Sequence, residues 1–182
     1  MFLSVTDNFM DLLAFNDNLT PSDLSVNILD VIRSKTAFNY TEGLINEFKN
    51  QGYVENEDLF LFPYDWRYGT SGRFADGTTN VDLLKVKIDS ILQQTGSDKV
   101  DVIAHSNGGL LIKKYVMDNP ASHKINKAVF VGVPNTGAPK AVKALVQGDN
   151  MGVSFAGLGL AESEMKEIAE NMPVAYDLLP SQ

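Results

Sequence analysis

A serine placed between small residues is the feature of this sequence that most directly indicates chemistry. Ser106 follows the apolar run Val100–Ala104 and precedes Asn107-Gly108-Gly109, an order typical of a buried strand that turns into a helix. It matches the small-x-Ser-x-Gly pattern of a nucleophile elbow, with Ala104 in the first position. Such a tight turn requires small residues two positions before and after the serine, here Ala104 and Gly108. Ser106 is therefore a candidate nucleophile, and the alternative is a serine that only caps the helix.

The backbone around this serine is suited to binding negative charge. The carboxyl edge of a parallel sheet, where Ser106 is expected, is the edge at which open α/β sheets bind ligands. The N–H of Asn107 opens the following helix, and together with the helix dipole it could stabilise an oxyanion.

A serine hydroxyl also needs a base, and the base needs a group that orients it. The chain has two histidines. We expect the side chain of His105 to diverge from that of its neighbour Ser106 at so sharp a turn. His123 follows a helix that rises about 1.5 Å per residue, so we expect it some 15 Å or more from Ser106. Neither is expected to be the base, and both are interpreted as turn or surface histidines.

The hydropathy pattern predicts the elements that hold these residues. Three apolar runs read as buried strands (59–62, 100–104 and 128–133), and four stretches read as helices (41–50, 81–92, 107–118 and about 161–171). Apolar strands that alternate with amphipathic helices indicate a parallel sheet covered on both faces. We expect one domain, with an irregular segment 1–37, a βα core 38–134 and a cap-like segment 135–182. The four glutamates of 162–170 read as a solvated helix face rather than a metal site.

Composition excludes several classes of protein. The 182 residues carry a net charge of −8 and 44% hydrophobic residues, so neither a disordered tail nor a basic nucleic-acid binder is expected. The absence of cysteine excludes disulfides, thiolate metal sites and cysteine nucleophiles. No stretch approaches the roughly 18 apolar residues of a membrane span, and the first residues lack a signal-peptide pattern. No cofactor or metal is indicated, and the compartment stays open.

Several longer motifs resemble a known family. They are Gln51–Tyr53, Asp58–Arg67, Ala104–Leu110, Gly132–Lys140 and Asn171–Pro180. Together they are similar to the lecithin:cholesterol acyltransferase family over most of residues 40–180, and Tyr64-Asp65-Trp66-Arg67 is the most specific of them.

This resemblance implies an α/β-hydrolase fold, here partial and incomplete at both ends, and acyl-ester chemistry on lipids. Ser106 would form an acyl-enzyme, passed to water by a lipase or phospholipase or to an alcohol by an acyltransferase. The backbone N–H of Asn107 would supply half of the oxyanion hole. Methionine is usual at position 107, so Asn107 should change the pocket lining more than the chemistry. Candidate substrate-binding residues are Tyr64, Asp65, Trp66, His105, Asn135 and Thr136.

Two of these assignments have structural alternatives. For Asp65 an ion pair with Arg67 is the favoured interpretation. Asn135 and Thr136 fit a plain turn as well as a site lining.

The acid and histidine of a triad have no clear place in the sequence. In this family's chain order both follow the serine, and residues after Pro134 show no further strand pattern. Residues 1–37 also contain no glycine for a second oxyanion loop. We therefore expect the middle of a longer enzyme, with the missing triad residues supplied by a longer chain or a partner. The alternative is an inactive fragment or a domain that binds lipid or a protein partner.

Overall fold

The computed structural model describes residues 14–18, 20–21, 40–149, 154–155, 158–159 and 162–180. Two parallel strands, β1 (Val100–His105) and β2 (Ile125–Val131), are joined by the helix α3 (Asn107–Asp118). Ile103 lies opposite Val129 and His105 lies opposite Val131 in the register of the sheet. The molecule is thus a mixed α/β protein with a small parallel sheet.

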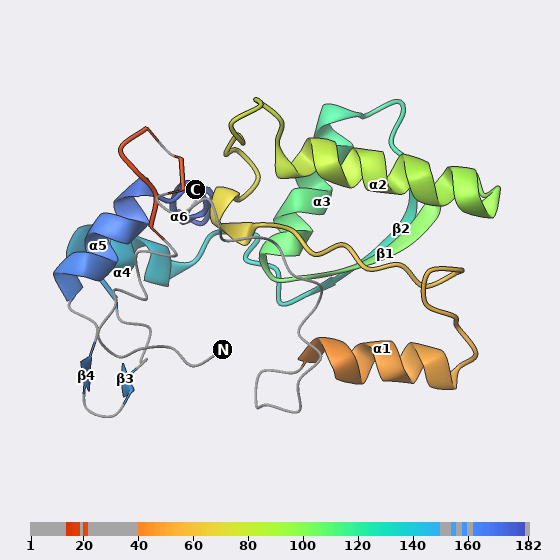
Figure 1. Ribbon diagram of the computed structural model, residues 1–182, viewed down its shortest axis with the longest axis horizontal. Helices are drawn as coiled ribbons and strands as arrows, with labels where there is room; N and C mark the ends of the chain where they lie inside the picture. Colours follow the sequence, from red (N-terminus) through yellow and green to blue (C-terminus); the bar gives the residue numbers. More distant parts are fainter. Residues whose placement is uncertain are drawn as a thin grey trace.

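The main core lies between this sheet and two helices. The helix α2 (Asn80–Thr95) begins with a capping box between Thr79 and Asp82 and ends at Gly96 in the left-handed conformation, which are common ways to begin and end a helix. It lies with α3 on one side of the strands (Figure 1). The buried members of the core come from these elements: Val81, Leu84, Ile88, Ala104, Leu111, Ile112, Tyr115 and Ile125.

The other face of the sheet is much more open than predicted. Ile103, Val129 and Val131 are 44%, 54% and 47% exposed. The helix α1 (Tyr40–Asn50) lies on this side of the strands (Figure 1), yet it leaves these side chains in contact with solvent. The prediction of fully buried strands is therefore wrong for both strands, because only Ala104 is buried in β1 and only Ile125 is buried in β2.

The apolar run 59–62 is not a strand. Among the described residues it forms one isolated bridge, between Glu55 and Leu59, and Phe62 packs against the core as irregular chain. Pro63 follows at once and has no N–H to offer a ladder, so hydrophobic burial proceeds here without strand pairing. Within the described ranges the sheet consequently has two strands where three were predicted.

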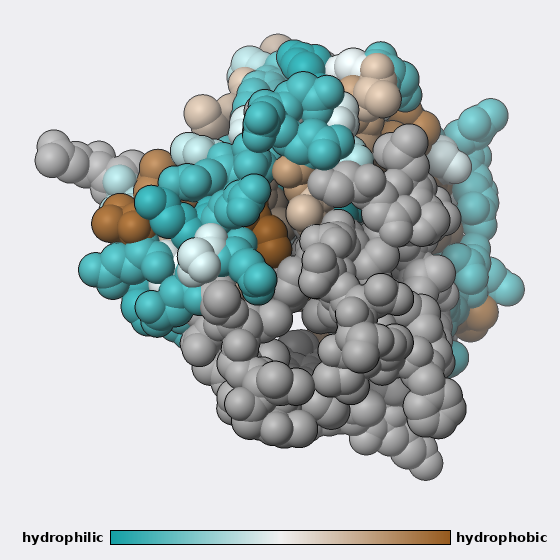
Figure 2. All heavy atoms as spheres, turned by 60° about the vertical axis from the view of Figure 1, so that its left-hand side comes forward, coloured by the Kyte–Doolittle hydropathy of each residue, from teal (hydrophilic) through white to brown (hydrophobic). Residues whose placement is uncertain are grey.

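The C-terminal part forms a second helical group beside the sheet (Figure 1). It contains α4 (Pro139–Gln147), α5 (Glu162–Asn171) and α6 (Pro173–Asp177), with the short strands β3 (Ser154–Phe155) and β4 (Leu158–Gly159) between α4 and α5. These two strands pair antiparallel, so the prediction of no strand after Pro134 is wrong. Ile168, Met172 and Val174 form its small core. Among the residues coloured by hydropathy in Figure 2, hydrophilic ones predominate, with a few separate hydrophobic residues. No helix in the described ranges is long and apolar enough to cross a membrane.

Candidate active site

The turn between β1 and α3 holds Ser106 in an uncommon backbone conformation. Its φ is +52° and its ψ is −128°, a region that side-chain-bearing residues rarely adopt. The Ser106 N–H donates to the carbonyl of Val131 over 2.9 Å, and the Ser106 carbonyl accepts from the N–H of Gly109 over 3.0 Å. Such a conformation costs of order 1–3 kcal/mol and persists where the surroundings enforce it. The predicted strand–turn–helix is thus present, and it is fastened to the end of β2.

Of the two glycines after Ser106, Gly109 is the one at which the structure requires glycine itself. A Cβ on Gly109 would overlap the side chain of Val133 and lie 2.7 Å from its Cγ1 atom. A Cβ on Gly108 would meet only the hydroxyl of Tyr64, at 3.8 Å, which is ordinary contact. An alanine would therefore fit at position 108, and the prediction of a small residue there stays a prediction. The close approach is between α3 and the chain that leaves β2.

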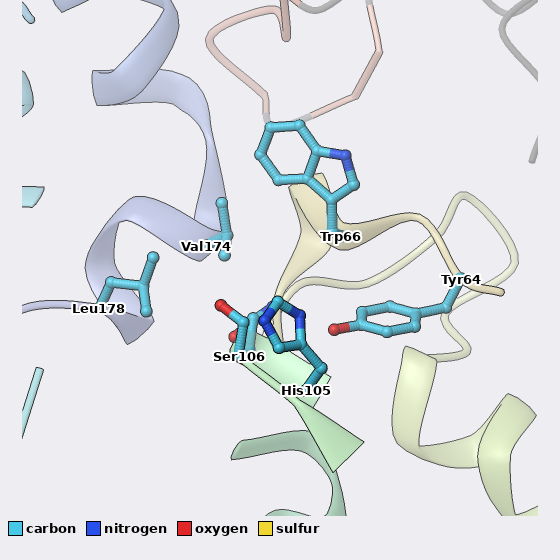
Figure 3. A pocket seen from close by; sticks show the side chains of 7 residues that line it. Tyr64, Trp66, His105, Ser106, Val174 and Leu178 are labelled. Carbon is cyan, nitrogen blue, oxygen red and sulfur yellow. The ribbon is translucent and has the colours of Figure 1, made fainter. Parts of the chain in front are cut away.

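Ser106 opens onto a pocket of about 350 Å³. Its lining comes from the elbow, from the segment before α2 and from α6: Tyr64, Trp66, His105, Ser106, Asn107, Val174 and Leu178. Tyr64, Trp66 and His105 were candidates from the sequence, and the structure brings them together with Ser106 (Figure 3). Val174 and Leu178 were missed, although their i, i+4 spacing on the motif 171–180 puts both on one face of a helix.

Three candidates are absent from this lining. Asp65 instead binds the buried side chain of Arg67, with 2.6 Å between Oδ2 and Nη2, so the ion-pair interpretation is confirmed. Asn135 takes a hydrogen bond from the Nζ of Lys113 through its Oδ1. Thr136 is exposed.

Buried polar contacts hold the segment before α2 in place. Asp65 accepts from the N–H of Arg67 and opens the short 3₁₀ helix η2 (Trp66–Tyr68). The fully buried Asn80 donates through its Nδ2 to the carbonyls of Asp65 and Gly69, over 2.8 and 2.9 Å. Because these bonds join the start of α2 to both ends of η2, they hold Trp66 at the pocket.

Asp177 fastens α6 to the same turn. Its carboxylate accepts from the N–H of Thr70 over 2.5 Å, from the Thr70 hydroxyl over 3.0 Å and from the Ser71 hydroxyl over 2.7 Å. Gly69 leaves the room for this approach, because a Cβ there would collide with the Asp177 carboxylate. Asp177 was not a candidate from the sequence. Its contacts join residues about a hundred positions apart, and no local pattern reveals such a pair.

Burial raises the pKa of Tyr64 to about 12, and the neighbouring side-chain amide of Asn107 opposes this rise in part. The phenol therefore stays protonated at any ordinary working pH. It adds a hydrogen-bond donor to a lining that is otherwise rich in apolar atoms.

The two histidines lie in different places. His105 lines the pocket beside Ser106. His123 follows α3, whose twelve residues begin next to Ser106, so it lies at the far end of that helix. Its Nδ1 atom is buried there without a hydrogen-bond partner.

The described structure defines a mixed α/β protein in which a serine between a strand and a helix borders a small pocket. A family model for lecithin:cholesterol acyltransferase matches residues 24–182. The chain belongs to this family.

Individual relatives support the assignment to this family. A phosphatidylcholine-sterol acyltransferase of Gallus gallus is 30% identical over 132 residues, which cover 71% of this chain and 30% of the relative. A lecithin-cholesterol acyltransferase-like protein 4 of Arabidopsis thaliana is 26% identical, covering 82% of this chain and 28% of the relative. A lysosomal phospholipase A and acyltransferase of Bos taurus is 29% identical, and the match covers 69% of this chain and 30% of the relative. The chain thus spans about 30% of the length of these relatives. No solved structure is significantly similar to it.

Proposed function

We propose that this chain carries the nucleophile of a serine-dependent acyl-ester hydrolase or O-acyltransferase that acts on lipid esters, within an α/β-hydrolase fold. The observation that carries the proposal is the positive φ of Ser106 at the turn between β1 and α3. Strain of this kind is concentrated at functional sites. The pocket next to it and the family membership support the same activity.

In the proposed reaction the Ser106 Oγ attacks the ester carbonyl carbon while its proton passes to a general base. The oxyanion of the tetrahedral intermediate faces the N–H of Asn107, which lacks an intrahelical acceptor because it opens α3. Collapse expels the alcohol, which takes the proton, and leaves an acyl group on Ser106. Water or a second alcohol then removes the acyl group by the reverse sequence.

The apolar side of the pocket suits an acyl chain. Trp66, Val174 and Leu178 come from two separate elements and line one cavity with Ser106. His105 borders the same cavity, and we assign it a substrate contact rather than the role of base. The base and its acid would lie outside the described residues.

The test uses the 182-residue chain and, in parallel, the product of the whole reading frame that contains it. Each is incubated with a chromogenic acyl ester, as parent, as Ser106→Ala and as Ser90→Ala, which removes an exposed hydroxyl from α2. We expect Ser106→Ala to lower the rate by roughly 10⁴-fold or more where the parent is active, because the nucleophile is lost. Ser90→Ala should match the parent. Equal rates for parent and Ser106→Ala would overturn the proposal.

A non-catalytic domain that binds lipid or a protein partner is the second candidate. The position of His123 at the far end of α3 favours it, because that histidine is out of reach of Ser106. A chain that binds lipid in this pocket yet shows no Ser106-dependent turnover in either form would support this candidate.

A further inference from the structure

The hydroxyl of Tyr64 reaches the first turn of α3 from outside the helix. It lies 3.8 Å from the point where a Cβ on Gly108 would be, two residues after Ser106. Figure 3 shows it pointing toward His105 and Ser106, and all three residues line the same pocket. The hydroxyl thus lies beside the first turn of α3, on the side of the pocket.

The amide of Asn107 shows that this corner of the pocket is incomplete. Both its Nδ2 and its Oδ1 atoms are buried without a well-formed hydrogen bond, although the amide adjoins the Tyr64 hydroxyl closely enough to affect its pKa. Buried polar groups in native proteins are nearly always paired, and an unpaired one calls for an explanation such as a functional role. A polar atom of a bound ligand would supply the hydrogen-bond partner that the Asn107 amide lacks.

We propose that Tyr64 is a catalytic hydrogen-bond donor, which holds the oxyanion formed at Ser106 together with the backbone N–H of Asn107. This inference rests on the proposed function and adds a second donor to it. The ligand class is a tetrahedral carbon or phosphorus centre that carries a negatively charged oxygen and an apolar chain.

Three properties suit Tyr64 to this role. Its proton is retained, because burial disfavours the phenolate. Its ring is fixed by packing against the core and by stacking on Phe62, with 5.9 Å between ring centroids, so little reorganisation is needed. The remaining lining is mostly apolar, and a hydrogen bond to an anion is strong in such surroundings.

The first experiment measures the rate at which an alkyl fluorophosphonate labels the product of the whole reading frame, which would include the base. In this reaction the Ser106 Oγ forms a bond to phosphorus, fluoride leaves and the hydroxyl proton passes to the base. We expect Tyr64→Phe to slow labelling by roughly 10²-fold, the usual effect of removing one oxyanion donor. Tyr68→Phe is the matched control, because Tyr68 is also buried but packs on Phe15 and Phe74 outside the pocket lining. An unchanged rate for Tyr64→Phe would overturn the inference, whereas absent labelling of the parent would count against the proposed function.

The second experiment needs no base and therefore stands apart from the proposed function. Trp66 is the single tryptophan of the chain and lines the pocket, so its fluorescence reports binding. The monoanion of an alkylphosphonic acid monomethyl ester serves as the oxyanion mimic, and the uncharged dimethyl ester is the reference ligand. We expect Tyr64→Phe to weaken binding of the anion about tenfold, the size of one charge-assisted hydrogen bond, and to leave binding of the dimethyl ester unchanged. Equal affinity of parent and Tyr64→Phe for the anion, or no binding of the anion by the parent, would overturn the inference.

Discussion

At the scale of single residues, the elbow depends on the missing side chain of Gly109. A methyl group there would overlap Val133, so either α3 or the chain after β2 must move. We expect Gly109→Ala to lower the free energy of unfolding by about 1–3 kcal/mol, the usual cost of overpacking. The matched change Gly108→Ala meets ordinary contact only and should leave stability unchanged or slightly higher, because alanine favours helix. Urea denaturation of both variants checks this, and equal losses would contradict it.

The raised pKa of Tyr64 makes stability depend on pH in the alkaline range. The unfolded phenol loses its proton near pH 10, whereas the folded one retains it up to about 12. Between these values the folded state binds more protons, so the free energy of unfolding must fall as pH rises. The loss should approach about 2–3 kcal/mol at the top of this window.

Denaturation from pH 9 to 11.5 measures this loss. Tyr64→Phe should remove most of the slope. The pKa of Tyr68 is also raised by burial, so Tyr68→Phe should remove a separate part of the dependence of stability on pH. A slope that is the same in the parent and in Tyr64→Phe would show that the phenol is not buried.

At the scale of elements, the wall of the pocket made by α6 depends on Asp177. Asp177→Asn removes a charged acceptor from Thr70 and Ser71, so we expect a loss of about 1–3 kcal/mol. Faster hydrogen exchange in α6 and a shift of Trp66 fluorescence should accompany it. Asp118→Asn is the control, since it removes an exposed pair with Lys114 and should cost at most about 0.5 kcal/mol. Protection of α6 that survives in Asp177→Asn would refute this role.

Elements with local signals were predictable from the sequence. The helix α2 has its capping box and its glycine stop, and α3 begins at the predicted Asn107. The helix α1 begins at Tyr40, one residue before its predicted start, and ends at the predicted Asn50. Two helices were missed although each has proline at its first position, Pro139 in α4 and Pro173 in α6, a common helix start.

Long-range features could not be predicted in the same way. An apolar run shows that its side chains favour burial but does not identify its partner, so 59–62 read as a strand. The pocket residues of α6 and the Asp177 contacts require two distant segments to meet. The sequence therefore indicated Ser106, Tyr64 and Trp66 through motifs, while the other wall of the pocket came from the fold.

At the scale of the whole molecule, we expect the open sheet face to bind hydrophobic molecules. Ile103, Val129 and Val131 adjoin one another on it, and contiguous exposed apolar patches bind hydrophobic dyes and partners. We expect the double variant Ile103→Thr, Val129→Thr to reduce binding of an anilinonaphthalene sulfonate dye clearly. Val86→Thr, on an exposed valine of α2, should not. A single exposed substitution of this kind should change the free energy of unfolding by about 0.5 kcal/mol or less. If the double variant bound as much dye as the parent, the proposal that these side chains form an exposed apolar patch would be contradicted.

The central claim is that the Ser106 hydroxyl is a nucleophile, and peptide-resolved mass spectrometry after fluorophosphonate treatment tests it most directly. The account predicts one phosphonyl adduct, on the peptide that contains Ser106. It also predicts that the adduct disappears in Ser106→Ala and persists in Ser90→Ala. An adduct on another residue, or a Ser106 peptide that stays unmodified in the product of the whole reading frame, would contradict it.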